Sequence, residues 1–207
     1  MVIKDVNNTH RLLKTLKVLE HKEIQVGVFG KDNYRYPNEA DLVTIAAVHE
    51  FGANIKTRNA KWLTIPIHPA AKGRRARDFS GLFFYQPKGK DYAFLARKKG
   101  KKGVENLFLL MKSVKIPERS FLRSGYDAHE KEIADKIFKL LPNVLAGAVP
   151  LDTFLDAVGL EFAGKIQSHA KKLRRPGNAE ATKATKGSSN PLYDTGRMIG
   201  AIRHEVK

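Results

Sequence analysis

The stretch 115–123, Lys-Ile-Pro-Glu-Arg-Ser-Phe-Leu-Arg, most constrains the fold because it separates two parts of different character. A segment rich in Lys, Arg and Gly precedes it, and helix-like sequence follows it. The residue before a proline favours extended backbone, and proline cannot donate to a strand ladder, so Ile116 and Pro117 indicate the end of a strand. Phe121 and Leu122 should be buried where the next helix begins. The stretch predicts a strand-to-helix junction.

The segment before residue 56 predicts a helix, a strand and a second helix. Apolar residues recur at helical spacing within 6–20, whereas 22–30 alternates with the period of a strand that Gly30 ends. Residues 42–51 form another apolar helical face, with Asp41 as its cap and Gly52 as its left-handed exit.

Residues 53–116 predict extended structure with basic turns. Two strands, 53–56 and 62–67, come first, and Pro66 places the second at a sheet edge or a strand end. A basic loop follows at 68–80. Apolar runs separated by lysine–glycine turns then predict a β meander. Its strands are expected at 82–85, 92–97 and 107–111, and the segment closes with 113–116.

After the junction the pattern is mainly helical. A helix is expected from Ser124 or Asp127 to about Leu141, where Pro142 stops or kinks it. A second helix should follow Pro150 and reach Leu173. Its small residues should allow close packing against a neighbour: Gly159, Ala163 and Gly164. Composition predicts a flexible loop at 176–191, then a helical turn at 192–198 and a last strand at 201–206. This mixture predicts an α+β fold: an antiparallel sheet packed with helices, plus an inserted basic β meander.

The positive charge is concentrated in one segment. The formal net charge is +17, of which residues 1–55 contribute zero, 56–116 contribute +13 and 117–207 contribute +4. We therefore expect residues 56–116 to present a positive electrostatic field. Such a field suits DNA or an acidic partner, although a solvated basic loop gives the same pattern. The candidate DNA- or partner-facing residues are Arg74, Arg75, Arg77, Lys98, Lys99, Lys101 and Lys102.

The sequence offers no constellation for catalysis, a cofactor or a metal. His49 and Glu50 resemble the start of a zinc-protease motif, but its second histidine would stand where the chain has Ala53. The chain contains no cysteine, which excludes disulfides and thiolate ligands. No apolar run reaches the length of a membrane helix and the N-terminus is unlike a secretion signal, so we expect a soluble protein made in the cytosol. The sequence predicts a non-enzyme without a catalytic, cofactor or metal site.

Three separated stretches, in this order, resemble one family. They are 26–30 followed by 45–52, the junction 116–123, and 186–198, which reads Lys-Gly-Ser-Ser-Asn-Pro-Leu-Tyr-Asp-Thr-Gly-Arg-Met. Together they resemble the tailed-bacteriophage virion morphogenesis and tail-completion proteins of the head–tail connector, or neck. The resemblance spans the chain apart from its middle. It implies that 1–55 and 117–207 form a common core, and the basic meander at 56–116 looks like the insertion of longer members.

The resemblance implies a non-enzymatic virion subunit at the neck or top of the tail, assembled in the host bacterial cytoplasm. Its partners would be copies of itself in a ring, commonly a hexamer, the neighbouring head-connector and tail-tube or terminator proteins, and packaged double-stranded DNA without sequence specificity. Asp194, Thr195 and Arg197 match the segment that introduces the family's last element, with capping and turn roles. The candidate inter-subunit residues are Arg119, Arg123 and Arg197. The alternative is a sequence-independent DNA-binding module.

Overall fold

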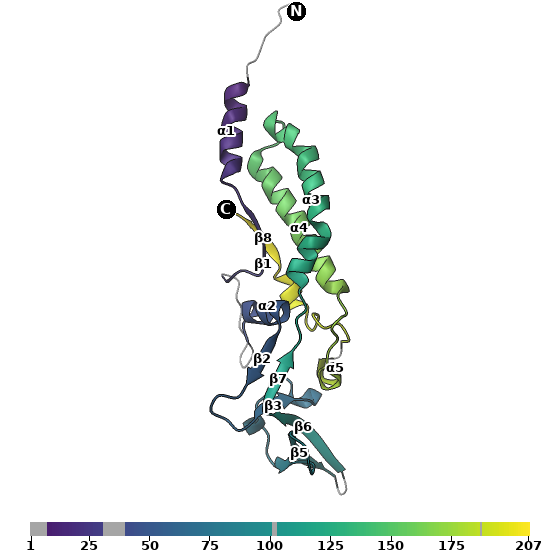
Figure 1. Cartoon of the computed structure of the whole chain (residues 1–207). Coiled ribbons are helices and arrows are strands. Elements are labelled where there is room, and N and C mark those ends of the chain that lie inside the picture. Colours follow the sequence, from purple (N-terminus) through teal and green to yellow (C-terminus); the bar gives the residue numbers. More distant parts are fainter. Residues whose placement is uncertain (1–7, 31–39, 101–102, 187) are drawn as a thin grey trace, which may run out of the picture.

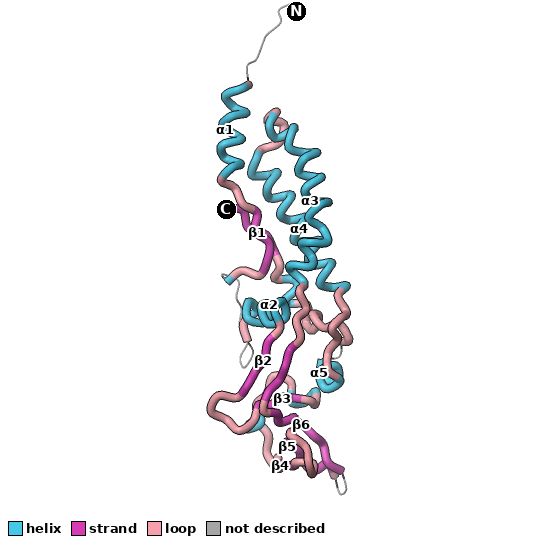
Figure 2. Tube along the Cα trace, viewed as in Figure 1, coloured by secondary structure: helices cyan, strands magenta, loops and turns pink. Residues whose placement is uncertain are grey.

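The computed structural model describes residues 8–30, 40–100, 103–186 and 188–207, which form an elongated molecule with a helical end and a sheet end (Figure 1). The helical end contains α1 (Thr9–Glu20), β1 (Ile24–Gly27), α2 (Leu42–Phe51), α3 (Phe121–Leu145), α4 (Leu151–Lys172), α6 (Arg197–Gly200) and β8 (Arg203–Val206). A two-stranded ribbon, β2 (Ala53–Lys56) with β7 (Ser113–Ile116), leads to the other end. Figure 2 shows the long helices toward one end of the molecule, with β1 beside them, and most of the strands toward the other end. The predicted α+β class with antiparallel pairing is confirmed.

The helical end is built on the α3–α4 hairpin, against which the antiparallel pair β1–β8 packs. Phe121, Ile166, Ile199 and Ile202 are almost fully buried in its central cluster. The backbones approach closely at Gly159, where a Cβ atom would lie 2.4 Å from the His204 ring. The close packing predicted for α4 therefore exists at Gly159, whereas Gly164 faces open space.

Helix α3 differs from its predicted bounds at both ends. It begins at Phe121, before the expected caps Ser124 and Asp127, and it continues through Pro142 to Leu145. The extra turn places Val144 in a buried apolar cluster with residues of α4. Tertiary burial therefore outweighs the loss of one backbone donor at the proline.

The ribbon β2–β7 begins at a tight contact. Gly52 ends α2 with φ +71°, and a Cβ atom there would lie 2.9 Å from the Glu118 amide nitrogen. Only glycine combines that φ with so close an approach. Directly after Gly52, Ala53 of β2 pairs with Ile116 of β7. The strand 113–116 was expected to close the meander, but it pairs with β2 instead.

The sheet end, which we call the basic lobe (residues 57–112), has its own small core. Its antiparallel sheet has the order β3-β6-β5-β4. Pro66 lies in the edge strand β3, as predicted. Leu107 and Phe108 are buried against the two short 3-10 helices η2 and η3. The elements are β3 (Leu63–Pro66), η2 (Pro69–Ala71), η3 (Ala76–Asp78), β4 (Phe83–Tyr85), β5 (Ala93–Lys99) and β6 (Gly103–Met111). The meander β4-β5-β6 is thus present.

The segment 176–191, expected to be a loop, contains helix α5 (Glu180–Lys186), which lies against η2 of the basic lobe. Among the described residues, no helix is long and apolar enough to cross a membrane.

Candidate functional site

Glu50, in the last turn of α2, supplies the cap of α3 from a distant part of the chain. Its side chain is only 3% exposed. The carboxylate accepts hydrogen bonds from the Ser120 hydroxyl (2.8 Å), the Leu122 amide (2.8 Å), and the Arg123 amide (3.0 Å) and guanidinium (2.9 Å). Burial, the largest single influence, raises the pKa of Glu50, but these bonds together hold it below its ordinary value. A buried carboxylate therefore satisfies the first free amides of α3.

Arg119 also connects distant parts of the chain at the junction, through hydrogen bonds of its own. Its side chain is buried, and it donates to the carbonyls of Pro176 (2.7 Å) and Gly177 (2.9 Å). Its Nη1 lies 3.3 Å from His49 Nδ1, and its amide donates to the His49 carbonyl. Burial lowers the pKa of Arg119. Arg119 thus joins three segments that are remote in sequence.

His49 is held neutral by this arrangement. Burial, followed by the positive charges of Arg119 and Lys186, lowers the pKa of His49 from 6.5 to about 4. A neutral ring can accept the Arg119 hydrogen bond through Nδ1. Glu50, Arg119, Arg123 and His49 form one set of contacts, which we call the junction network.

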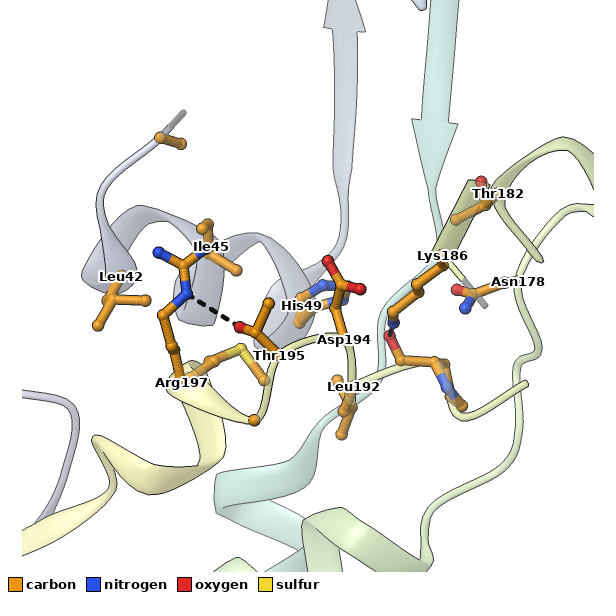
Figure 3. Close-up of a pocket in the computed structure, with 14 residues that line it drawn as sticks. Leu42, Ile45, His49, Asn178, Thr182, Lys186, Leu192, Asp194, Thr195 and Arg197 are labelled. Atoms are coloured by element: carbon orange, nitrogen blue, oxygen red, sulfur yellow. Dashed lines mark hydrogen bonds between the residues drawn. The ribbon is translucent and has the colours of Figure 1, made fainter. Parts of the chain in front are cut away.

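A pocket of about 390 Å³ lies next to the junction network, between α2, α5 and the turn before α6. Figure 3 shows Thr195 and Arg197 at one side, Lys186 and Asn178 at the other, and His49 with Asp194 between them.

The charged groups of this pocket already have partners. Lys186 donates to the carbonyls of Asn190 (3.0 Å) and Pro191 (2.9 Å), and burial lowers the pKa of its ammonium group. Asp194 pairs with Lys72 of the basic lobe at 2.9 Å, and Arg197 donates to the Thr195 hydroxyl. The Lys72–Asp194 pair links the C-terminal turn to the basic lobe, and the Arg197–Thr195 bond lies within the turn itself.

One serine–histidine pair was not anticipated from the sequence. The Ser124 hydroxyl lies 2.8 Å from His169 Nε2, between α3 and α4. The same hydroxyl also donates to the Ser120 carbonyl one helical turn earlier. Across the described ranges, no group of three His, Cys, Asp or Glu residues could hold a metal ion.

The predicted basic surface lies on the basic lobe. Arg74, Arg75, Arg77, Lys98 and Lys99 are all exposed. Arg74 lies over the Phe79 ring at 4.0 Å, and Lys99 is 3.5 Å from Glu105. Successive side chains of a strand alternate between faces, so Lys98 and Lys99 point to opposite sides of the sheet. Lys101 and Lys102 lie outside the described residues.

The predicted inter-subunit arginines separate into two kinds. Arg119 is 4% exposed and enclosed by groups of its own chain, so the expectation that it contacts a neighbouring subunit does not fit its position. Arg123 has a side chain that is 54% exposed and lies over the exposed Phe51 ring at 4.8 Å. Arg197 is half-buried at the rim of the pocket.

The sequence did not predict the capping role of Glu50, which it places only in an incomplete zinc-protease motif with His49. A charged residue next to Phe51, at the end of an otherwise apolar helix, was the available signal.

Comparison with known proteins gives no relative on which a function could be based. No family model matches the chain, and neither a curated protein nor a solved structure matches it.

Proposed function

We propose that this chain is a structural virion protein of a tailed phage or prophage, a tail-completion or head–tail connector subunit that forms a ring around the DNA channel. The observation that carries the proposal is the meeting of the three stretches of the resemblance in one core. Ala46, Phe121, Leu192 and Met198 belong to the central cluster of the helical end, and Val26 packs against that cluster.

The hydrogen bonds at the junction support the same proposal. Glu50 belongs to the first stretch, and its partners Ser120, Leu122 and Arg123 belong to the second. The third stretch provides Lys186, whose charge acts on His49 of the first. Stretches that contact one another in this way form one structural unit. We expect this if the three stretches together build the folded core of an assembly subunit.

The surface of the molecule also suits assembly. Large apolar side chains are exposed at both ends of the monomer, including Leu13, Phe84 and Phe138. Such side chains are available to pack against neighbouring subunits. The elongated shape gives one subunit two separate ends with which to reach neighbours (Figure 1).

Deletion of the gene from the phage or prophage that carries it tests the proposal. We expect DNA-filled heads and separate tails that fail to join, and expression of the wild-type chain in trans should restore joined particles. Infectious particles in normal numbers from the deletion would contradict the proposed function.

A second function, sequence-independent DNA binding, is favoured by the exposed cations of the basic lobe, which also exposes the aromatic residues Phe84 and Tyr85. Binding of duplex DNA by purified protein would then fall steeply with salt, with a logarithmic slope of about −0.9 for each phosphate neutralised. A flat salt dependence would exclude this function.

A further inference from the structure

The two faces of the sheet in the basic lobe differ in what covers them. One face packs against the 3-10 helices, where Phe108 of β6 and Ala71 of η2 are buried in one apolar cluster. Leu95 of β5 is directly opposite Phe108 and packs against the same cluster. Residues opposite each other on paired strands share a face, and successive residues of a strand alternate between faces. The neighbours of Leu95 along β5 therefore lie on the other face.

That other face carries a row of apolar and aromatic side chains across all four strands. Phe94 of β5 is directly opposite Tyr85 of β4 and Leu109 of β6. Leu109 is in turn opposite Ile65 of β3. Each of the four is at least partly exposed, and none belongs to or packs against the buried apolar clusters of the described residues. This face of the sheet is therefore open.

Four aromatic side chains gather where β4 and β5 meet on the open face. Phe83 and Tyr85 are two residues apart on β4 and are 36% and 49% exposed. The Tyr85 ring stacks on Phe94 with a centroid distance of 6.4 Å, and Tyr92 meets Phe94 edge-on at 5.5 Å. We call these four residues the aromatic face. Figure 2 shows β4 and β5 at the end of the molecule away from the long helices.

Lys98 adds a positive charge to the same side of the sheet. It follows Phe94 by four residues on β5, so both point to one face. Lys98 is exposed, and no described residue forms an ion pair with it. Arg97 and Lys99 point to the other face, where both pair with Glu105. The cation on the open face is therefore available to a ligand.

The turn between β4 and β5 supplies further charge at the other end of the rings. Lys88 and Lys90 are exposed there, with Asp91 as the carboxylate of the turn. The basic lobe as a whole has a formal charge of +11, from fourteen Lys and Arg against three Asp and Glu. Two lobes of that charge repel each other, so a second copy of the chain does not suit the open face.

We propose that the aromatic face binds single-stranded nucleic acid, with bases stacked on its rings and phosphates beside Lys98 and the β4–β5 turn. Every base has a π face, so such stacking does not depend on sequence. In a duplex the bases are stacked on each other and could not reach the rings. An acidic protein would match the lysines but would leave the rings without a specific role. The inference goes beyond both proposed functions, because neither gives these rings a ligand.

Fluorescence anisotropy with the purified chain tests the class of ligand. An oligothymidylate is compared with an abasic strand of equal phosphate number, at a salt concentration that weakens phosphate contacts. The oligothymidylate should bind at least about tenfold more tightly, because stacking acts at each base. Equal affinities would overturn the proposal, as would tighter binding of a polyglutamate peptide, which would indicate an acidic protein partner. An oligouridylate of the same length tells RNA from DNA, and a preference for either over the abasic strand supports the site.

Neighbouring residues on the two faces of the sheet provide matched controls. Tyr85→Ala should weaken oligothymidylate binding about tenfold and spare the abasic strand, whereas Phe84→Ala, 53% exposed on the other face, should affect neither. Lys98→Ala should weaken both and reduce the logarithmic salt slope by about 0.7, the value for one phosphate of a single strand. Lys99→Ala should change less, because Lys99 pairs with Glu105. Equal effects within either pair of variants would contradict the assignment to the aromatic face.

Photo-cross-linking locates the bases on the wild-type chain and does not depend on the folding of a variant. A single strand that contains iodouracil should cross-link to the aromatic face, as identified by mass spectrometry. Cross-links found only elsewhere on the chain would overturn the proposal. This result is independent of the deletion phenotype and of duplex binding, which test the two proposed functions. Circular dichroism confirms that each substituted chain is folded.

Discussion

Replacement of Glu50 by glutamine should destabilise the chain strongly because the carboxylate caps α3. Its Oε1 atom accepts bonds from the Ser120 hydroxyl and from the amide and guanidinium of Arg123, and its Oε2 atom accepts the Leu122 amide. Glutamine retains the shape and one acceptor. Its NH2 group would then face a donor, most simply the Leu122 amide, and the negative charge beside Arg123 would be lost.

The magnitude follows from these bonds. A hydrogen bond to a charged group contributes about 1.5–3 kcal/mol, and a buried donor left unsatisfied costs about 1–3 kcal/mol. Because glutamine keeps part of the network, we expect the free energy of unfolding to fall by about 3 kcal/mol. For a chain of this size that corresponds to a melting temperature lower by roughly 6–12 °C.

Glu118→Gln is the matched control, because Glu118 also accepts a hydrogen bond from Arg123, at 2.7 Å. Both side chains of that pair are 54% exposed, so its loss should cost less than about 1 kcal/mol. Thermal and urea unfolding followed by circular dichroism compare the two variants. Equal losses of stability in Glu50→Gln and Glu118→Gln would refute the argument that burial of the carboxylate is decisive.

Three further predictions concern other parts of the chain. Folding lowers the pKa of His49 from 6.5 to about 4, so between these pH values the unfolded chain binds a proton that the folded chain does not. The free energy of unfolding should therefore fall as the pH is lowered from 6.5 to about 4, by at most about 3 kcal/mol. His49→Gln should remove this component from urea unfolding measured at each pH; an unchanged pH profile would argue against a neutral His49. Gly159→Ala should lower the free energy of unfolding by about 1–3 kcal/mol, and with it the melting temperature, because the new Cβ displaces the His204 ring. Gly164→Ala, in open space, should raise the melting temperature slightly. A stabilising Gly159→Ala would show that the contact is loose. Lys98→Glu with Lys99→Glu should reduce phage titre or DNA retention; wild-type values would remove these residues from the assembly surface.

Local signals in the sequence predicted α2 fully. Asp41 accepts the Thr44 amide at 2.8 Å, and Gly52 ends the helix with positive φ, so both boundaries depend on neighbouring residues. Local sequence signals also predicted the meander and the edge position of Pro66, from its basic turns and from the missing amide hydrogen of proline.

The start of α3 could not be predicted in this way. Its cap is Glu50, which is remote in sequence and reaches the helix only in the folded chain. The extension past Pro142 likewise depends on burial of Val144 against α4. Arg119 was expected to contact a neighbouring subunit, and only the fold brings the Pro176 and Gly177 carbonyls around it.

The position of the protein in the virion tests the proposed function most directly. Particles that carry a gold-labelled version of the chain, viewed by electron microscopy, should show the label at the head–tail junction or the top of the tail. Native mass spectrometry of the isolated assembly should give a single multiple of the 23.2 kDa chain mass. Label absent from purified particles, or distributed over the capsid or the tail tip, would contradict the account.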